Sequence, residues 1–419
     1  MGEKIYGLLG RKLGHSWSVP IHRALGCPDY RLWEVEPEDL PAFLSREDIG
    51  GLNVTIPYKR DVIPFCQELD RGAQAIGSVN TLVRGADGRL RGYNTDLVGF
   101  LTMARRAGIP FAGRKVLVLG SGGASLTVQA AAPMEGAGEV AVISRTGPDN
   151  YENLRERHGG AQILVNATPA GMWPQVEEQP VDLALLPRLE GVLDLIYNPL
   201  RTNLLLQAQA LGLPCSGGLP MLVEQAAAAE ERFFSRAIPR EKTEEILSGL
   251  WQDRANLVLV GMPGCGKTTV GRALAQISGR ALLDLDAEIV RRAGKPIPEI
   301  FQTEGEAAFR ALESRTLAEV FSDRNGWIIA TGGGAVLREE NRAAMRRSGR
   351  VYFLRRGLDQ LPTDGRPLSQ GADLGEMYRT RLPLYEAAAD MAIENDTTAE
   401  ETAARIWRDF CAYSGDQRP

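Results

Sequence analysis

The stretch NLVLVGMPGCGKTTV, residues 256–270, decides the fold of the C-terminal part of this chain. An apolar run typical of a strand passes into a glycine-rich loop that is closed by a lysine and two threonines, at the spacing of the phosphate-loop template. In that template, backbone N–H groups curl around phosphates, the lysine reaches the transferring phosphate and the next hydroxyl binds Mg²⁺. A chance glycine turn is the alternative, but strand and helix flank the motif as it requires. We therefore predict a P-loop whose nucleotide is bound by Gly264, Cys265, Gly266, Lys267, Thr268 and Thr269.

Downstream of this loop, carboxylates and an arginine stand at positions suited to phosphoryl transfer. RALLDLD (280–286) reads as a strand, and its Asp284 and Asp286, two residues apart, are expected to point to the same side. A stretch rich in Gly, Pro and Asp, residues 357–375, contains Arg366 and has the composition of a mobile cover.

Upstream of the loop, residues 236–254 contain Pro239 and a charge-rich segment with no strand pattern. Ile246, Leu247 and Leu250 recur at helical spacing, so we predict a helical connection between two domains. Some 255 residues precede the P-loop and must form a separate structure.

That N-terminal part carries a second glycine-rich turn, KVLVLGSGGAS (115–125), between a predicted strand and a predicted helix. This is a varied form of the dinucleotide-binding fingerprint, which is weak on its own. EVAVISRT (139–146) supplies the next strand, and Arg145 stands where an NAD site would carry an acidic residue. An arginine there accommodates a 2′-phosphate, so the cofactor is predicted to be NADP, although an ordinary surface arginine is the alternative.

Lys59 and Asp96 are the candidate acid–base pair of the N-terminal part. GLNVTIPYK (51–59) reads as a strand that places Lys59 at the head of a helix, and residues 90–108 read as a strand followed by a helix that begins near Asp96. Such residues are usually surface charges, but these two sit among Asn, Thr and Gly at the ends of elements, where sites are built.

Ser16 and Ser18 form a second polar feature near the N-terminus. They follow a short apolar strand, residues 4–10, at a strand-to-helix loop. Two hydroxyls there could hold a carboxylate or hydroxyls of a ligand, or they could simply cap the helix. The local pattern does not choose between these roles.

Composition limits the partners. The chain has 419 residues, 44% of them hydrophobic, and a formal net charge of −5, which suggests two or three domains and argues against a nucleic-acid partner. Five cysteines form no CxxC pair, as expected for reduced thiols in a cytoplasmic protein. The N-terminus does not read as a signal sequence and no window approaches 18 apolar residues, so we expect no membrane segment. The expected partners are small molecules, and the chain is expected to be a monomer or homodimer.

Taken in order, these motifs resemble two known families. Residues 1 to about 237 resemble shikimate dehydrogenase through HSWS, NVTIPYK, SVNT, GYNTD, GSGGAS, SRT, NATPAGM and MLVEQ. Residues 255 to about 412 resemble shikimate kinase through GMPGCGKTT, DLD, FRALE, TGGG, RPL and RLPLYEAA. The resemblance implies an α/β fold, with an N-terminal α/β substrate domain plus a Rossmann-like NADP domain, followed by a P-loop domain like that of nucleoside-monophosphate kinases. The implied boundaries are 1–238 (substrate lobe about 1–100 and 220–238, NADP lobe 101–219), a helical linker 239–254, and 255–419.

The resemblance also implies roles for individual residues. In the first domain, Lys59 and Asp96 would be catalytic, and the substrate would be bound by Ser16, Ser18, Thr55, Asn80, Tyr197 and Gln225. The NADP contacts would be Gly120, Gly122, Gly123, Ala124, Ser144, Arg145, Thr146 and Gly218. In the second domain, Asp286, Lys267 and Arg366 would be catalytic, Thr268 and Asp284 would hold Mg²⁺, and shikimate would contact Asp286, Arg310, Gly332, Gly333 and Arg381.

The implied function is NADPH-dependent reduction of 3-dehydroshikimate to shikimate, followed by ATP-dependent phosphorylation of shikimate at its 3-hydroxyl. Two alternatives stay open: a quinate/shikimate dehydrogenase that uses NAD, and a non-catalytic N-terminal module that regulates a kinase. The absence of an acidic residue beside Arg145 argues against the first, and the presence of Lys59 with Asp96 argues against the second.

The chain departs from the family patterns in three places. Only twenty positions separate Thr146 from Asn166, so we expect one helical unit of the cofactor domain to be missing and the adenine side of its pocket to be altered. Pro220 precedes MLVEQ in place of an expected glycine. The kinase lid, residues 357–365, is short and poor in arginine, so its closure is expected to be weaker.

Overall fold

The computed structural model describes residues 4–14, 16–361 and 374–413. The chain groups into two compact units, which are Met1–Tyr197 with Gln207–Leu247, and Asn198–Leu206 with Ser248–Gly415. This grouping differs from the expected boundaries because it assigns Asn198–Leu206 to the second unit and places the division inside helix α9 (Arg240–Arg254). The boundaries at residues 238 and 255 therefore stay a prediction.

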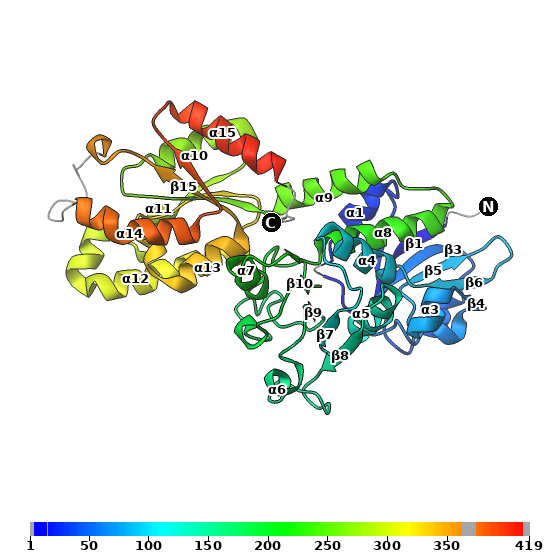
Figure 1. Ribbon diagram of the computed structural model, residues 1–419. Coiled ribbons are helices and arrows are strands. Elements are labelled where there is room, and N and C mark those ends of the chain that lie inside the picture. Colours follow the sequence, from blue (N-terminus) through cyan, green and yellow to red (C-terminus); the bar gives the residue numbers. More distant parts are fainter. Residues whose placement is uncertain (1–3, 15, 362–373, 414–419) are drawn as a thin grey trace. The chain divides into compact units, whose positions relative to one another are not determined.

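The first unit contains a mixed sheet of six strands in the order β2-β1-β3-β5-β6-β4 (Figure 1). The strands are β1 (Ile5–Gly10), β2 (Arg31–Glu34), β3 (Ile49–Val54), β4 (Glu68–Leu69), β5 (Thr81–Arg84) and β6 (Leu90–Tyr93). Strands β1, β2 and β3 run parallel, whereas β5 is antiparallel to both β3 and β6. All six residues of β3 are buried, as expected for a strand covered on both faces.

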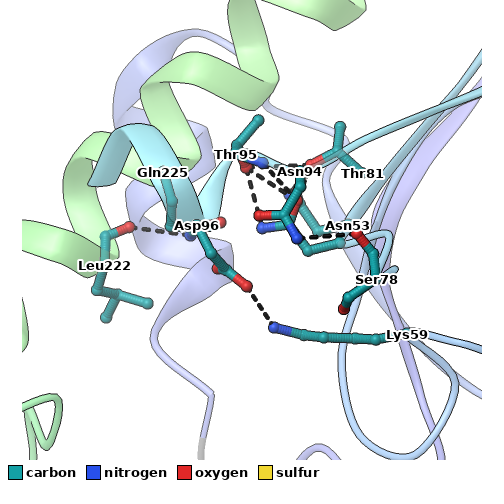
Figure 2. A network of polar contacts seen from close by, with 10 residues as sticks. Asn53, Lys59, Ser78, Thr81, Asn94, Thr95, Asp96, Leu222 and Gln225 are labelled. Atoms are coloured by element: carbon teal, nitrogen blue, oxygen red, sulfur yellow. Dashed lines mark hydrogen bonds and ion pairs between the residues drawn. The ribbon is translucent and has the colours of Figure 1, made fainter. Parts of the chain in front are cut away.

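Three helices beside this sheet carry residues of the predicted site, and they are α1 (Ser18–Leu25), α4 (Asp96–Arg106) and α8 (Leu219–Phe234). The other helices of this part are α2 (Leu40–Leu44) and α3 (Arg71–Ile76). Helices α4 and α8 pack closely because Gly99 has no side chain: a Cβ there would lie 2.6 Å from the Met221 carbonyl oxygen. Their contact brings Asp96 on α4 and Gln225 on α8 toward the same region (Figure 2).

The second sheet of this unit is fully parallel, in the order β11-β10-β9-β7-β8. Its strands are β7 (Lys115–Leu119), β8 (Glu139–Ile143), β9 (Ile163–Asn166), β10 (Gly191–Asp194) and β11 (Cys215–Ser216), and its helices are α5 (Gly123–Met134), α6 (Leu154–His158) and α7 (Asn203–Ala210). The link from β8 to β9 contains only the five-residue helix α6. The short spacing after Thr146 is thus accommodated by a crossover with little helix.

The predicted connecting helix is present as α9. It begins at Arg240, after Pro239, and its buried apolar residues are Ile246, Leu247, Leu250 and Trp251. Within the described part of the chain, no helix combines the length and the apolar character needed to cross a membrane.

The second unit is built on a parallel sheet in the order β13-β14-β12-β15-β16. Its elements are β12 (Asn256–Val260), α10 (Lys267–Ser278), β13 (Leu282–Asp284), α11 (Leu285–Ala293), α12 (Ile297–Asp323), β14 (Ile328–Ala330), α13 (Glu339–Ser348), β15 (Gly349–Arg355), α14 (Leu374–Ala388), β16 (Met391–Glu394) and α15 (Ala399–Ala412). Helices α10 and α15 cover one face of the sheet and α13 and α14 the other (Figure 1). Every residue of the central strand β12 is buried.

One predicted strand boundary is wrong. Strand β13 ends at Asp284 because that carboxylate caps α11 by accepting a hydrogen bond of 3.2 Å from the Ala287 N–H. Asp286 therefore lies in the first turn of α11 and not on the strand, so the expectation that the two aspartates share one side of a strand does not apply. Helix α12 consists of two helical segments that meet at a kink, because the backbone at Gly305 is non-helical.

Candidate active sites

A cavity of about 250 Å³ lies in the first unit between the six-stranded sheet, helix α8 and the end of β10. The residues predicted to form the first substrate site all line it: Ser16, Ser18, Thr55, Lys59, Asn80, Asp96, Tyr197 and Gln225. Ala124 and Gly218, from the predicted cofactor set, line it as well. The remaining members of that set, Gly120, Gly122, Gly123, Ser144, Arg145 and Thr146, are not among its lining residues. The structure thus collects residues from six separated motifs around one space.

Lys59 and Asp96 form a close pair on the wall of this cavity (Figure 2). The Lys59 Nζ lies 2.6 Å from Asp96 Oδ2, with side-chain exposures of 23% and 12%. Asp96 is the first residue of α4, where the helix dipole favours a carboxylate. Lys59 lies in a turn after β3 and not at the head of a helix as predicted, and its carbonyl accepts a hydrogen bond of 2.8 Å from the Val79 N–H. A partly desolvated ammonium is therefore held in one orientation beside the cavity.

The two serines near the N-terminus lie both at the start of α1 and on the wall of the cavity, and their binding of substrate stays a prediction. Ser16 Oγ accepts a hydrogen bond of 3.2 Å from the Ser18 N–H, which satisfies a free donor at the start of α1. Ser16 Oγ also donates to Ser18 Oγ at 3.0 Å, and both residues line the cavity. Helix capping and exposure to a ligand are compatible here.

Aromatic and amide groups complete the wall. The rings of Trp17 and Tyr197 meet edge to face with centroids 5.1 Å apart, and burial raises the pKa of the Tyr197 phenol. The Gln225 side chain donates to the Leu222 carbonyl at 3.0 Å, which fixes its amide at the cavity (Figure 2). Asn53, which the sequence analysis passed over, also lines the cavity and is 4% exposed.

The glycine turn after β7 fits a dinucleotide phosphate. Gly120 has φ +99°, and a Cβ there would lie 2.9 Å from Thr168 Cγ2, so a larger residue is excluded. At Gly122 and Gly123 an added Cβ would meet no described atom within 4 Å, which leaves open space at the N-terminus of α5. Free N–H groups at such a helix start bind phosphate. Arg145 is exposed just beyond β8, where a 2′-phosphate would be reached.

The P-loop of the second unit has the conformation that its glycines predict. Gly261, Gly264 and Gly266 have φ of 147°, 85° and 100°. Lys267 begins α10 and its Nζ curls back over the loop, donating to the carbonyls of Gly261 at 2.8 Å and Met262 at 2.9 Å. The loop therefore holds its lysine inside the curve where phosphates would bind.

Thr268 and Asp284 meet beside this loop. Thr268 Oγ1 donates to Asp284 Oδ2 at 2.6 Å. A hydroxyl and a carboxylate oxygen are ligands that suit Mg²⁺, which usually keeps several waters and binds substrate phosphates at the same time. The donor set present fits the metal predicted from the sequence.

A charged cluster borders the glycine loop that follows β14. Arg310 Nη1 donates to Glu313 Oε2 at 2.7 Å, and the Glu313 side chain is 1% exposed. Burial raises the pKa of Glu313, and Arg310 opposes that shift. A Cβ at Gly332 would lie 2.7 Å from Asp286 Oδ1 and 3.0 Å from Glu313 Oε1. Asp286, Arg310 and Gly332 are thus brought together, with Glu313 as a member to which the sequence analysis gave no role.

Helix α14 holds the same glycine loop from another direction. The Gly333 carbonyl accepts hydrogen bonds from Arg381 Nη1 at 3.2 Å and from the Tyr385 hydroxyl at 2.6 Å. Tyr385 is fully buried and its pKa is raised, chiefly by that burial. Arg381 therefore lies beside Gly333, and its predicted contact with shikimate stays a prediction, whereas the positioning contact of Tyr385 was not foreseen. The predicted lid arginine, Arg366, lies outside the described residues.

Comparison with known proteins agrees with this arrangement. Residues 8–82 match the model of the shikimate dehydrogenase substrate binding domain, and residues 263–410 match that of shikimate kinase. The shikimate dehydrogenase (NADP(+)) of Geobacillus kaustophilus is 37% identical over 256 residues, covering 55% of this chain and 92% of the relative. That of Methanopyrus kandleri is 37% identical over 272 residues, covering 58% and 93%.

Solved structures show the same likeness for the N-terminal part. A chorismate mutase/shikimate 5-dehydrogenase fusion protein from Clostridium acetobutylicum is 36% identical with a TM-score of 0.57, over 60% of this chain and 97% of that one. Shikimate 5-dehydrogenase from Thermus thermophilus, in complex with NADP(H) and shikimate, is 35% identical with a TM-score of 0.51, over 58% and 97%.

The folds and sites define a bifunctional enzyme, in which an α/β oxidoreductase is joined to a P-loop kinase. The chain belongs to the shikimate dehydrogenase family through its N-terminal part, and a shikimate kinase domain follows in the same polypeptide. The predicted fold class is confirmed.

Proposed function

We propose that this chain catalyses two reactions of the shikimate pathway, the NADPH-dependent reduction of 3-dehydroshikimate to shikimate and the ATP-dependent phosphorylation of shikimate at its 3-hydroxyl. The observation that carries the first reaction is the Lys59–Asp96 pair, 2.6 Å apart on the wall of a cavity that also presents Ser16, Ser18, Asn80 and Gln225. The second reaction is supported by the P-loop, over which Lys267 folds, and by the charged cluster around Gly332. The product of the first site is the substrate of the second.

Reduction of a ketone needs a hydride at the carbonyl carbon and a proton at the oxygen, where negative charge develops. NADPH supplies the hydride when it is bound. Lys59 would place its ammonium at the carbonyl oxygen and give it a proton, while Asp96 orients that ammonium through its 2.6 Å contact. Hydroxyls and amides from Ser16, Ser18 and Asn80 would hold the carboxylate and ring hydroxyls of the substrate.

Phosphoryl transfer depends on positioning and charge neutralisation more than on covalent steps. ATP supplies the transferred group, and Lys267 would leave the loop carbonyls to reach its phosphates. Thr268 and Asp284 would hold Mg²⁺, with Arg366 adding charge from the lid. Asp286 would accept or orient the proton of the attacking hydroxyl, and Arg310 with Arg381 would clamp the substrate carboxylate through planar guanidinium groups.

Arg145 supports NADPH over NADH as the reductant. It is exposed beyond the end of β8, where a bidentate contact with a 2′-phosphate is available. The competing proposal is an NAD-using quinate/shikimate dehydrogenase, since a quinate dehydrogenase from Corynebacterium glutamicum in complex with NAD is 28% identical with a TM-score of 0.53. Initial rates with NADPH and NADH on 3-dehydroshikimate, and with quinate and shikimate in the reverse direction, separate the two.

A regulatory N-terminal module without catalysis is the remaining alternative, and the same assay tests it. The oriented ammonium and carboxylate are both present, which favours a working reductase. No NADPH oxidation with 3-dehydroshikimate, in a preparation that phosphorylates shikimate normally, would overturn the first half of the proposal.

We further propose a cytoplasmic location, because all five cysteines of the chain are free thiols. Small molecules are the proposed partners, and the state of assembly stays a prediction of a monomer or homodimer. Neither membrane nor nucleic acid enters the proposal.

A further inference from the structure

A chain of buried hydrogen bonds adjoins the substrate cavity of the first unit, which two of its members, Asn53 and Asn80, line. Figure 2 shows its part around Asn53, Thr81 and Thr95. The chain of hydrogen bonds begins at Tyr30, whose hydroxyl donates to Asn53 Oδ1 at 2.8 Å. Asn53 Nδ2 donates to Thr81 Oγ1 at 3.3 Å, and Thr81 Oγ1 donates to Asn80 Oδ1 at 3.0 Å. None of these four residues is more than 4% exposed, so water does not compete for these bonds.

The chain ends in a reciprocal contact between Asn80 and Thr95. The Asn80 amide group donates to Thr95 Oγ1 at 3.0 Å, and its carbonyl oxygen accepts from the Thr95 N–H at 2.7 Å. Thr81 Oγ1 lies 3.2 Å from Thr95 Oγ1 as well. The Thr81 hydroxyl therefore touches three partners, Asn53, Asn80 and Thr95, and stands at the centre of the network.

This network fixes the start of helix α4. Thr95 is the N-cap residue of α4 and makes no side-chain cap hydrogen bond, because its hydroxyl is used by Asn80. The next residue is Asp96, whose carboxylate orients Lys59. The position of Thr95 thus determines where that carboxylate stands.

Lys59, the partner of Asp96, is bound through its backbone to the residues at the start of strand β5. The Val79 N–H donates to the Lys59 carbonyl at 2.8 Å, and the Val54 N–H donates to the Asn80 carbonyl at 2.7 Å. The segment from Val79 to Thr81 consequently holds the backbone of Lys59 on one side and the N-terminus of α4 on the other.

We propose that Thr81 is a positioning residue for the reductase reaction and that Tyr30 is the outer anchor of the same network. This inference rests on the proposed reduction of 3-dehydroshikimate. Neither residue lines the cavity, whereas Asn80 and Asp96 both do. The Thr81 hydroxyl acts through them, by setting the direction of the Asn80 amide and the place of the Asp96 carboxylate relative to Lys59.

The size of the effect follows from the geometry that catalysis demands. A misplacement of about 1 Å away from the reacting atoms can reduce a rate by about 10²-fold. Thr81→Val keeps the shape of the side chain but removes the hydroxyl, which leaves Asn80 and Asn53 short of a partner in a buried region. We expect kcat for 3-dehydroshikimate to fall by about 10- to 100-fold, with a raised KM for that substrate and an unchanged KM for NADPH.

Two further variants distinguish positioning from a general loss of packing. Thr81→Ser restores the hydroxyl without the methyl group and should return kcat to within about threefold of wild type. Thr127→Val is the matched control, because Thr127 is also buried and, among the described residues, its hydroxyl has no hydrogen-bond partner. That control should leave the rate unchanged, shikimate phosphorylation by the intact chain reports that the second unit is folded, and an unchanged KM for NADPH reports that the first unit is.

Tyr30→Phe tests the outer end of the network in a double-mutant cycle. Tyr30 and Thr81 act through the same hydrogen bonds. The fold-decrease in kcat of the double variant Tyr30→Phe/Thr81→Val should therefore be clearly smaller than the product of the two single-variant decreases. Wild-type kcat in Thr81→Val, or a Thr81→Ser variant as slow as Thr81→Val, would overturn the positioning role. An inactive wild-type reductase would instead overturn the proposed function, so the two failures are distinct.

Discussion

At the scale of single residues, the pair Lys59 and Asp96 makes the sharpest prediction. Lys59→Ala removes the proposed proton donor, and acid–base groups contribute roughly 10²- to 10⁴-fold to a rate. We expect NADPH oxidation with 3-dehydroshikimate to fall by that factor while ATP-dependent phosphorylation of shikimate stays near normal, since the two sites lie in different units. Asp96→Ala should behave alike. A loss below threefold in both variants would remove the pair from the mechanism.

Arg145 makes a prediction about cofactor choice. Hydrogen bonds to charged groups contribute about 1.5–3 kcal/mol, which corresponds to roughly 10- to 100-fold in affinity. Arg145→Ala should raise the KM for NADPH by about that factor and leave the KM for NADH nearly unchanged. Fluorescence titration with both nucleotides checks binding apart from turnover. Equal weakening of both would give Arg145 a structural role in the turn after β8.

Lys267 and Asp286 should separate binding from chemistry in the kinase. Lys267→Ala is expected to reduce shikimate-dependent ATP consumption by at least about 10²-fold, because it removes charge at the transferring phosphate. Asp286→Asn keeps the size of the side chain but cannot take a proton, so kcat should fall more than ATP affinity. Normal NADPH oxidation in both variants is the control. A wild-type kinase rate in Lys267→Ala would contradict the P-loop assignment.

Residues at motif positions could be predicted, whereas residues that act through tertiary contacts could not. Local sequence patterns contain Lys59, Asp96 and Lys267, and these patterns indicate the chemistry without knowledge of the fold. Thr81 gains its place only when β5 is brought beside β3 and the start of α4. Glu313 similarly depends on the approach of α12 to the loop after β14, which periodicity alone does not reveal.

At the scale of elements, helices α1 and α8 enclose a histidine–carboxylate pair with a pH-dependent stability. His22 Nδ1 lies 2.6 Å from Glu230 Oε1, both side chains are 0% exposed, and the His22 ring stacks on Tyr30. Burial lowers the pKa of His22 and outweighs the opposing effect of Glu230. The unfolded chain therefore takes up a proton at a higher pH than the folded one.

It follows that this site stabilises the first unit above the ordinary histidine pKa of about 6.5 and that the contribution is lost as pH falls below it. The slope is at most about 1.4 kcal/mol per pH unit for one proton. We expect the urea midpoint for loss of reductase activity to decrease between pH 7.5 and 5.5. The decrease should be smaller in the double variant His22→Phe/Glu230→Leu, and an identical decrease in that variant would place the pH dependence elsewhere.

The elements themselves were largely predictable, and the exceptions have physical causes. The apolar runs at β7 and β12 are buried strands and were recognised from the sequence alone. The end of β13 was misplaced because Asp284 caps a helix at a position where the apolar alternation of the sequence continues. Strand β16 was missed because it is only four residues long and three of them are exposed.

At the scale of the whole molecule, each unit has its own sheets and its own buried core. We predict that residues 1–238 and 253–419, produced separately, fold and retain reductase and kinase activity respectively, because each is long enough to bury a core. Circular dichroism and the two assays check this. Residues Asn198–Leu206 group with the second unit but belong to the piece 1–238. The folding of that piece therefore tests the prediction more strictly than the folding of 253–419. Absence of both folding and activity in either piece would show that the units depend on each other.

The folded-back lysine of the P-loop has a consequence for how this chain can change by mutation. Lys267 donates to the carbonyls of Gly261 and Met262, so it completes the loop before any nucleotide arrives. A replacement that cannot donate would leave the buried Gly261 carbonyl without this partner, and such a group costs about 1–3 kcal/mol, whereas the Met262 carbonyl would keep the Cys265 N–H at 3.2 Å. In a lineage that no longer needed phosphorylation, replacement of this lysine would thus still reduce the stability of the loop. Retention of the lysine in a chain is therefore a sign of an intact loop architecture, whether or not the loop still transfers phosphate.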